Sequence, residues 1–333
     1  MVTRFHACAA VLAVAVATLA GAAGASGAGS RPTPSLRVYT VNMENLLTEK
    51  AQCPGDWHNL AKYIADRPKP DIVFLQEIGG KTQLREFVAR LNRATRGNDF
   101  VGMAAPGTAN THERTCTAQK SHQLNAIVWK RDELAYLPGS LKSWQSLHEK
   151  HHHCVRTKHS GTRDLKAIFS VKGQGTVTAA SLHWSTPYAG GRPCAAANAR
   201  DVDRQLSAGD YGGTGLQIAA GDLNISAWTR AHQHRAWYQF LTRAHFADAG
   251  ERAAAWTHVA KHGAGHKRRI DFVWARHGAG DPARFVGAVT VGFKEVAKLD
   301  RRPWTERHCF TYPKDHQLGC DYSEHRAVST EVR

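Results

Sequence analysis

Short apolar runs of strand length recur along this chain, and several of them stop on residues that carry reactive or metal-binding groups. The run DIVFLQEI at residues 71–78 is apolar at consecutive positions until Gln76 and Glu77. Such a run favours a strand that is buried on both faces. The run LQIAAGDLN at 216–224 ends in the same way, on Asp222 and Asn224. These runs constrain the chain to a layered sheet protein whose polar groups gather at strand ends.

Strand-like and helix-like segments are mixed over the rest of the chain. The apolar spacing predicts helices within 57–70, 82–95, 198–209 and 235–244. A glycine-containing turn at 172–175 is predicted to join two neighbouring strands as a hairpin. This mixture predicts an α/β or α+β protein built from layered sheets. Further strands are predicted at 36–42, 124–131, 165–171, 176–183, 268–276, 285–293 and 324–332.

Seven polar residues lie at or near the ends of these predicted strands. For any one of them a simple turn is an alternative explanation, because Gly, Asp and Asn are the usual turn formers. If the strands pack in sheets, however, their ends can meet at one edge and form a pocket of carboxylates, amides and two histidines. The seven residues are Asn42, Glu77, His183, Asp222, Asn224, Asp271 and His325.

The chemistry of such a pocket suits a phosphate ester and a hard cation. Mg²⁺ takes one or two carboxylates together with water and substrate phosphate oxygens. Glu77 and Glu324 could supply those carboxylates. A histidine paired with an aspartate has a fixed tautomer and can act as a general base.

Six segments resemble the endonuclease/exonuclease/phosphatase superfamily, in that family's order, from residue 36 to the C-terminus. They are VNMENLL, PDIVFLQEI, SLHWSTP, AAGDLNIS, RRIDFVW and SEHRAV. The resemblance implies a deoxyribonuclease I-like fold, an α/β four-layer sandwich of two packed mixed β-sheets flanked by helices. It also implies hydrolysis of phosphodiester bonds assisted by Mg²⁺, with Mn²⁺ or Ca²⁺ as alternative ions.

The resemblance also implies roles for the metal-binding and water-orienting residues. Glu77 matches the metal-binding glutamate of the family, and Asn42 matches the asparagine beside it. Asp222 and Asn224 match the pair that orients the attacking water and holds the phosphate.

Two histidines and an arginine complete the resemblance. His325 matches the general base, or the phosphate-binding histidine of other proposals, and Asp271 matches the aspartate that orients it. His183 is similar to the second active-site histidine of deoxyribonuclease I-like enzymes. Arg163 stands where a phosphate-contacting arginine is often found.

The chain departs from the family pattern at two places. Glu324 precedes the last histidine, where the family usually has aspartate, so a longer arm would have to reach the metal. The glutamate that pairs with the first histidine is not obvious, and Gln123 and Asn125 stand near its expected place. We therefore expect His183 to be less basic than it would be beside that glutamate.

The N-terminus and the cysteines indicate an extracellular protein. Residues 1–28 combine Arg4, an apolar stretch and small residues, which predicts a secretory signal peptide. Residues 29–35 are then a flexible leader, and 36–333 form one domain. Outside the signal peptide six cysteines remain, an even number that allows three disulfides. Cys309 and Cys320 are the pair closest in sequence and the only pairing we predict.

The net charge is +16, from 44 Lys and Arg against 28 Asp and Glu, and it falls to +15 when Arg4 is removed. This excess favours a polyanionic partner. We therefore expect a secreted, monomeric nuclease that acts on DNA, RNA or both. The alternatives are a sphingomyelinase-like enzyme acting on membrane lipid and a binding module without turnover. A lipid enzyme needs an exposed apolar hairpin to enter a bilayer, and the sequence offers no such hairpin.

Three further segments carry residues that could bind a ligand. GHKRRI at 265–270 is predicted to contact phosphate through Lys267 and Arg268. Trp184 and Trp228 could stack on a base or belong to the core. EKHHHC at 149–154 is predicted to be an exposed basic loop beside a disulfide rather than a metal site.

Overall fold

The computed structural model describes residues 34–43, 57–106, 123–158, 162–186, 191–226, 232–251, 256–259, 267–278, 280–291 and 325–333. The predicted signal peptide with Cys8, the predicted Cys309–Cys320 pair, Cys53, Cys116, Trp228 and Glu324 lie outside these residues. All the described residues belong to one compact unit, Pro32–Arg333. Within the described part of the chain, no helix has the length and apolar character needed to cross a membrane.

The first sheet has six strands in the order β16-β17-β1-β2-β4-β3. Strands β1 and β2 run parallel, and β17 and β4 flank them in antiparallel fashion. The bounds are β1 Leu36–Asn42, β2 Ile72–Ile78, β3 Phe100–Ala104, β4 Leu124–Lys130, β16 Phe285–Val291 and β17 Ala327–Val332.

The second sheet follows the order β12-β15-β11-β10-β9-β5, with β6 also paired to β9. Strands β10 and β11 run parallel, and β15 and β9 flank them in antiparallel fashion. The bounds are β5 Leu134–Tyr136, β6 Lys142–Gln145, β9 Arg163–Val171, β10 Gly175–His183, β11 Leu216–Asp222, β12 Ala247–Asp248 and β15 Asp271–His277.

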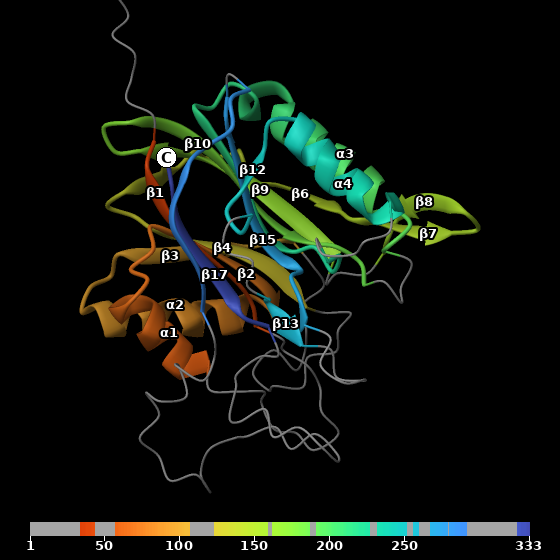
Figure 1. The fold of residues 1–333 in the computed structure, drawn as a ribbon. Helices are drawn as coiled ribbons and strands as arrows, with labels where there is room; N and C mark the ends of the chain where they lie inside the picture. Colours follow the sequence, from red (N-terminus) through yellow and green to blue (C-terminus); the bar gives the residue numbers. More distant parts are fainter. Residues whose placement is uncertain are drawn as a thin grey trace, which may run out of the picture. The chain divides into compact units, whose positions relative to one another are not determined.

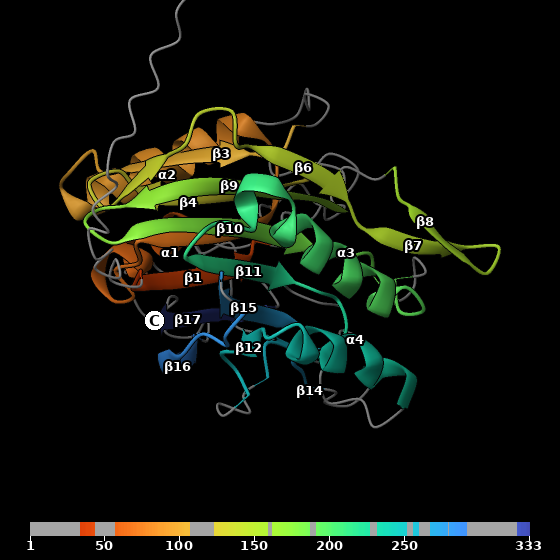
Figure 2. The same cartoon turned by 90° about the horizontal axis from the view of Figure 1, so that it is seen from above.

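Helices cover the outer face of each sheet and make the four layers that the resemblance implies (Figures 1 and 2). The pair α1 and α2 packs on the first sheet, and the pair α3 and α4 packs on the second. A short 3-10 helix, η4 (Gly209–Tyr211), follows α3. The predicted α/β sandwich is thus confirmed. The helix bounds are α1 Trp57–Asp66, α2 Lys81–Thr95, α3 Ala195–Ser207 and α4 His232–Arg243.

Strand β2 shows why a continuous apolar run was needed. Ile72 and Phe74 face the core between the two sheets, whereas Val73 and Leu75 face the helices α1 and α2. All four side chains are fully buried. Alternate side chains of a strand point to opposite faces, so a strand in the middle of four layers has to be apolar on both.

A buried polar contact joins the two sheets next to their polar ends. The side chain of Gln76 on β2 donates to the hydroxyl of Ser181 on β10, with an Nε2–Oγ distance of 3.1 Å. That hydroxyl in turn donates to the carbonyl of Leu75 over 3.2 Å. These contacts hold the end of β2 against the end of β10, and both ends carry predicted site residues.

Gly221 allows β11 to come close to β10 just before Asp222. Its φ is 149°, and a Cβ at this position would lie 1.9 Å from the carbonyl oxygen of Leu182. No side chain fits there, because backbone atoms of β10 occupy the space. The glycine in AAGDLNIS is therefore required by the close approach of two strands.

Two parts of the fold differ from the sequence prediction. Strand β3 was not predicted, and its centre, Gly102, has no side chain to contribute to a pattern. The segment around EKHHHC is exposed beside a disulfide, as predicted, but it forms a strand pair rather than a loop. The pair consists of β7, Leu147–Lys150, and β8, His153–Arg156.

Replacing Gly221 tests the close approach of β10 and β11. We expect Gly221→Ala to lower the free energy of unfolding by about 1–3 kcal/mol, because the strand must shift or adopt a strained conformation. Urea unfolding measures the change. Gly213→Ala is the matched control, since the nearest atom to its added Cβ would be the Asp210 carbonyl oxygen at 3.6 Å. Equal stability of both variants would contradict this account.

Candidate active site

Strand pairing brings the predicted residues from both sheets to one edge. Asn42 ends β1 and lies opposite Gln76 of the parallel β2. His183 and Asp222 end the parallel strands β10 and β11 and lie opposite each other. Asp271 begins the antiparallel β15 and also lies opposite Asp222. The ends of parallel strands and the start of an antiparallel neighbour coincide, which places these side chains together.

A bulge in β2 sets the direction of the Glu77 side chain. The register between β2 and β4 shifts between Leu75 and Ile78, and Glu77 has a φ of 55°. This left-handed conformation is costly for a residue with a Cβ, and bulges often re-aim side chains beside active sites. The Glu77 carboxylate accepts hydrogen bonds from Asn42 Nδ2 at 3.2 Å and from Gln123 Nε2 at 2.9 Å.

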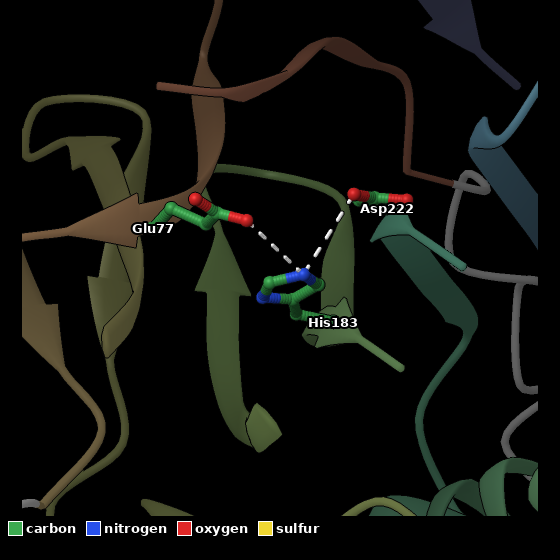
Figure 3. A group of neighbouring side chains, drawn as sticks. All are labelled: Glu77, His183 and Asp222. Carbon is green, nitrogen blue, oxygen red and sulfur yellow. Dashed lines mark ion pairs between the residues drawn. The ribbon is translucent and has the colours of Figure 1, made fainter. Parts of the chain in front are cut away.

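The first group of candidate metal ligands consists of Glu77, His183 and Asp222 (Figure 3). The Nε2 atom of His183 points between the two carboxylates, 3.5 Å from Glu77 Oε1 and 3.7 Å from Asp222 Oδ2. One possible ligand atom from each residue lies within 4.8 Å of the others. Asn42 Nδ2 donates to Asp222 Oδ2 at 3.0 Å as well as to Glu77, so the amide holds the two carboxylates side by side.

The second group shares Asp222 and adds Asp271 and His325. His325 Nδ1 lies 3.0 and 3.2 Å from the two oxygens of Asp271, and its Nε2 lies 3.8 Å from Asp222 Oδ2. Burial raises the pKa of the Asp271 carboxyl, and the charge of the facing His325 opposes that rise. The pair therefore holds the imidazole with its Nε2 turned to the centre of the site.

Residues that were not predicted hold this pair in place. The hydroxyl of Thr257 accepts hydrogen bonds from the backbone N–H groups of Ile270 and Asp271, at 2.9 and 3.0 Å. The ring of His258 lies 4.7 Å from that of His325, centroid to centroid. His258 begins the short strand β13, His258–Val259, and Thr257 directly precedes it; β13 pairs with β14, Lys267–Arg268. The sequence around Thr257 shows no pattern that would predict its contact with the start of β15, more than ten residues farther along the chain.

A buried carboxylate supports His183 from behind. Asp164 Oδ1 accepts a hydrogen bond from the backbone N–H of His183 at 2.6 Å. Complete burial raises the pKa of Asp164 well above its ordinary value. Among the described residues, Asp164 Oδ2 and His183 Nδ1 have no hydrogen-bond partner. Gln123, which stood near the expected partner of His183, instead bonds to Glu77.

Asn224 is held by the turn that follows β11. Its φ is 53°, and its backbone N–H donates to Asp222 Oδ1 at 2.7 Å. Its side-chain amide donates to the carbonyl oxygen of Trp184 at 3.0 Å. The turn links the Asp222 carboxylate to the end of β10. Asn224 therefore lies beside Asp222, and its Nδ2 atom already donates a hydrogen bond to Trp184.

The other predicted substrate-binding residues come from β9 and β14. Arg163 begins β9, and its guanidinium donates to the hydroxyl of Ser143 at 3.3 Å. Arg268 lies on β14, is half-buried and pairs with His258. For Lys267 only the backbone is described. Their roles in phosphate binding stay predictions.

Trp184 and Arg269, which adjoin predicted site residues, are buried and stabilise the fold. Trp184 is 1% exposed and packs edge-on against Trp237, so it belongs to the core and does not offer a stacking face. Arg269, inside the GHKRRI run, is buried in an ion pair with Asp248.

The layers and the polar edge define a sandwich-type enzyme whose site is built for a phosphate ester. The model of the endonuclease/exonuclease/phosphatase family matches residues 39–293, and the chain belongs to this family. Its members are divalent-metal-dependent enzymes that hydrolyse phosphodiester bonds. No curated protein matches the chain in a sequence search.

Solved structures share the fold at low sequence identity. A humanized TDP2 of D. rerio is 16% identical with a TM-score of 0.55, covering 90% of this chain and 99% of its own. A family protein from Bacteroides vulgatus is 12% identical with a TM-score of 0.57 and the same coverage. The human Nocturnin catalytic domain is 12% identical with a TM-score of 0.54, over 90% and 93% of the two chains. At these identities the likeness shows the fold alone.

The donor set fits a divalent metal ion. Glu77 and Asp222 offer carboxylate oxygens, and His183 offers a ring nitrogen in the same group. Hard cations prefer the oxygens, whereas softer divalent ions also accept imidazole. Glu324 lies outside the described residues, so its predicted role as a ligand stays a prediction.

The Asp271–His325 pair is expected to be essential for turnover. We expect His325→Ala to lower turnover by about 10²–10⁴-fold, the usual contribution of a general base. Asp271→Asn should also be severely impaired, because an amide can hold the wrong tautomer. Initial rates on a phosphodiester substrate measure the losses. Both variants should melt near the parent temperature, and near-normal rates in folded His325→Ala protein would contradict the assignment.

The raised pKa of Asp164 predicts a pH-dependent stability. Between the ordinary pKa of aspartate and the raised one, the folded protein holds a proton that the unfolded chain has lost. The free energy of unfolding should therefore fall as the pH rises through this interval. We expect Asp164→Asn to reduce this slope, as measured by urea unfolding at about pH 5 and about pH 8. The exposed Asp210→Asn should keep it, and an unchanged slope in Asp164→Asn would contradict the prediction.

Proposed function

We propose that the chain is a secreted, divalent-metal-dependent nuclease that hydrolyses phosphodiester bonds of DNA, and of RNA as a second substrate. One observation carries the proposal. Asp222 is shared by two buried groups, with the Nε2 atoms of His183 and His325 at 3.7 and 3.8 Å from its Oδ2 atom. A phosphate that enters between them meets a carboxylate, two imidazoles and a metal-binding edge at once.

Each residue of the site then has a distinct role in the reaction. Asp271 fixes the ring of His325, so that His325 Nε2 can take a proton from the attacking water. Asp222 lies within reach of that nitrogen and orients the water towards phosphorus. His183 Nε2 faces the same carboxylate from the other side and is placed to hydrogen-bond a phosphoryl oxygen. Asn42 keeps the carboxylates of Glu77 and Asp222 in place.

Glu77, with Asn42 beside it, is the main candidate to hold Mg²⁺, and Mn²⁺ or Ca²⁺ are alternatives. When bound, such an ion neutralises charge that develops on the phosphoryl oxygens. The bulge that turns Glu77 into the site supports this role, because a strained backbone is retained where its geometry matters.

Charge supports nucleic acid over lipid as the substrate. The chain carries a net charge of +16, and polyanions gain affinity from contacts between cations and phosphates. Entry into a bilayer requires an exposed apolar element. Among the described residues, the exposed large apolar side chains are Leu137, Val286 and Val289. They lie at the end of β5 and on the edge strand β16, and they form no hairpin tip.

The predicted signal peptide and a disulfide support secretion. Cys154 and Cys194 form a disulfide between the β7–β8 hairpin and α3. Disulfides persist mainly in oxidising, extracytoplasmic compartments.

A substrate panel tests the proposal. Plasmid DNA, RNA and sphingomyelin are offered in parallel with Mg²⁺, Mn²⁺, Ca²⁺ or excess EDTA. We expect cleavage of the nucleic acids with metal and loss of cleavage in EDTA, because phosphoryl charge is then not neutralised. Glu77→Gln should need more metal for half-maximal activity. Cleavage of sphingomyelin alone would favour the lipid alternative, and full activity in EDTA would overturn the metal role of Glu77.

A further inference from the structure

A two-stranded hairpin leaves the body of the protein at the active-site edge. Strand β6 ends at Gln145, which pairs with Arg163 at the start of β9. The next residue, Ser146, has its hydroxyl oxygen 3.4 Å from that of Ser185, two residues after His183. Figure 2 shows β7 and β8 extending beyond the ends of β10 and β11. The base of the hairpin therefore contacts the segment that follows β10, the strand that carries His183.

The hairpin is held rigidly although it has no core of its own. An isolated two-stranded hairpin is marginally stable at best in water. Here the Cys154–Cys194 disulfide ties β8 to the start of α3. The Asn198 side chain accepts from the backbone N–H of Leu147 at 2.7 Å and donates to the carbonyl of Leu147 at 3.0 Å. These contacts fix the direction in which the hairpin projects.

One face of the hairpin is directed to α3 and the other is free to meet a partner. Cys154 is bonded to Cys194, and Arg156 donates to both carboxylate oxygens of Asp201 on α3. Side chains alternate along a strand, so the opposite face carries His148, Lys150, His153 and Val155. Lys150 and, two residues after β8, Lys158 supply positive charge here, and Glu149 is the one acidic residue between 147 and 158.

The tip is an unusual turn made of two histidines. His151 and His152 both have positive φ, 51° and 63°. Such a two-residue turn normally takes Asn and Gly, because side chains with a Cβ strain it. The side chain of His152 is 96% exposed. His152 Nδ1 lies 3.4 Å from Glu149 Oε1, a contact within the hairpin itself. A strained, exposed and polar tip of this kind is suited to contact a partner outside the chain.

We propose that residues 147–158, the basic arm, bind the phosphate backbone of a nucleic-acid duplex next to the scissile bond. The proposal rests on the proposed function and names how its polymeric substrate is gripped. A four-residue strand spans roughly 13 Å, which covers roughly four base-pair steps of a duplex. The arm thus contacts long substrates and lies beyond the reach of a single phosphodiester held at Asp222.

Nucleic acid suits the arm better than an anionic membrane. Insertion into a bilayer interface requires apolar or aromatic side chains at the tip, and this tip consists of His151 and His152. Lysine and histidine side chains, by contrast, pair with phosphates without entering an apolar phase. A rigid arm also gains more from a regular phosphate backbone, because no further ordering is needed on binding.

The test compares two double charge reversals with the same formal change. The arm variant carries Lys150→Glu and Lys158→Glu, both exposed. The control carries Lys69→Glu and Lys172→Glu, which are exposed and stand before the start of β2 and after the end of β9, at the opposite edge. Each pair is placed in the His325→Ala background and titrated with a duplex of about 30 base pairs at several salt concentrations.

We expect the arm variant to raise Kd for the duplex about tenfold or more at moderate salt. It should also reduce the slope of log K against log salt by about two, since each lost phosphate contact removes about 0.9. The control should change Kd much less, because charges beyond a screening length of about 10 Å contribute little. Equal weakening by both variants, or no weakening by the arm variant, overturns the proposal.

Two further measurements separate this proposal from the proposed function. With His325 intact, kcat/KM is measured for the duplex and for bis(4-nitrophenyl) phosphate, and the arm variant should lose more on the duplex than on the small diester. If the parent cleaves neither substrate, the proposed function fails while the titration still reports on the arm.

Phosphatidylserine vesicles serve as the second ligand in the binding titration. Weaker vesicle binding with unchanged duplex binding by the arm variant would overturn the nucleic-acid assignment in favour of a membrane.

Discussion

Face-to-face packing of the two sheets is the constraint on which the site depends. Asn42 and Glu77 come from one sheet, and His183, Asp222 and Asp271 come from the other. Apolar side chains from both inner faces form the core between them. The amide of Asn42 then reaches carboxylates of both sheets, at 3.2 and 3.0 Å. A slip of one sheet along the other would separate the halves of the site.

The apolar layers stabilise a polar edge that is itself unfavourable. Three carboxylates and two imidazoles are buried there, and burying charge costs free energy unless partners compensate. Glu77 and Asn224 add backbone strain through positive φ angles. Hydrogen bonds that Asn42 and Gln123 donate to Glu77, and the hydrogen bond that the Asp271 N–H donates to Thr257, offset part of this cost. The same crowding of charge makes the edge suitable for a metal ion and a phosphate.

The strands that form the middle of the sandwich could be predicted because both of their faces are buried. Ile72, Val73, Phe74 and Leu75 show this in consecutive positions. Elements with weaker local patterns were missed, such as β3 with its central glycine and the β7–β8 hairpin with its polar strands. The hairpin depends on a disulfide and on side chains of α3, which are contacts across the fold rather than local preferences.

By itself, the sequence determined which residues stand at strand ends, and together with the family resemblance it predicted that Glu77, His183, Asp222, Asp271 and His325 would share one edge. Strand ends are local features, written in the apolar runs that precede them. Only the tertiary structure decided which residues support that edge. Asp164 lies behind His183 and Thr257 behind Asp271 because strands distant in sequence are packed together. The tertiary structure also placed Trp184 in the core, since the side of a strand that faces a helix is decided by the packing of layers.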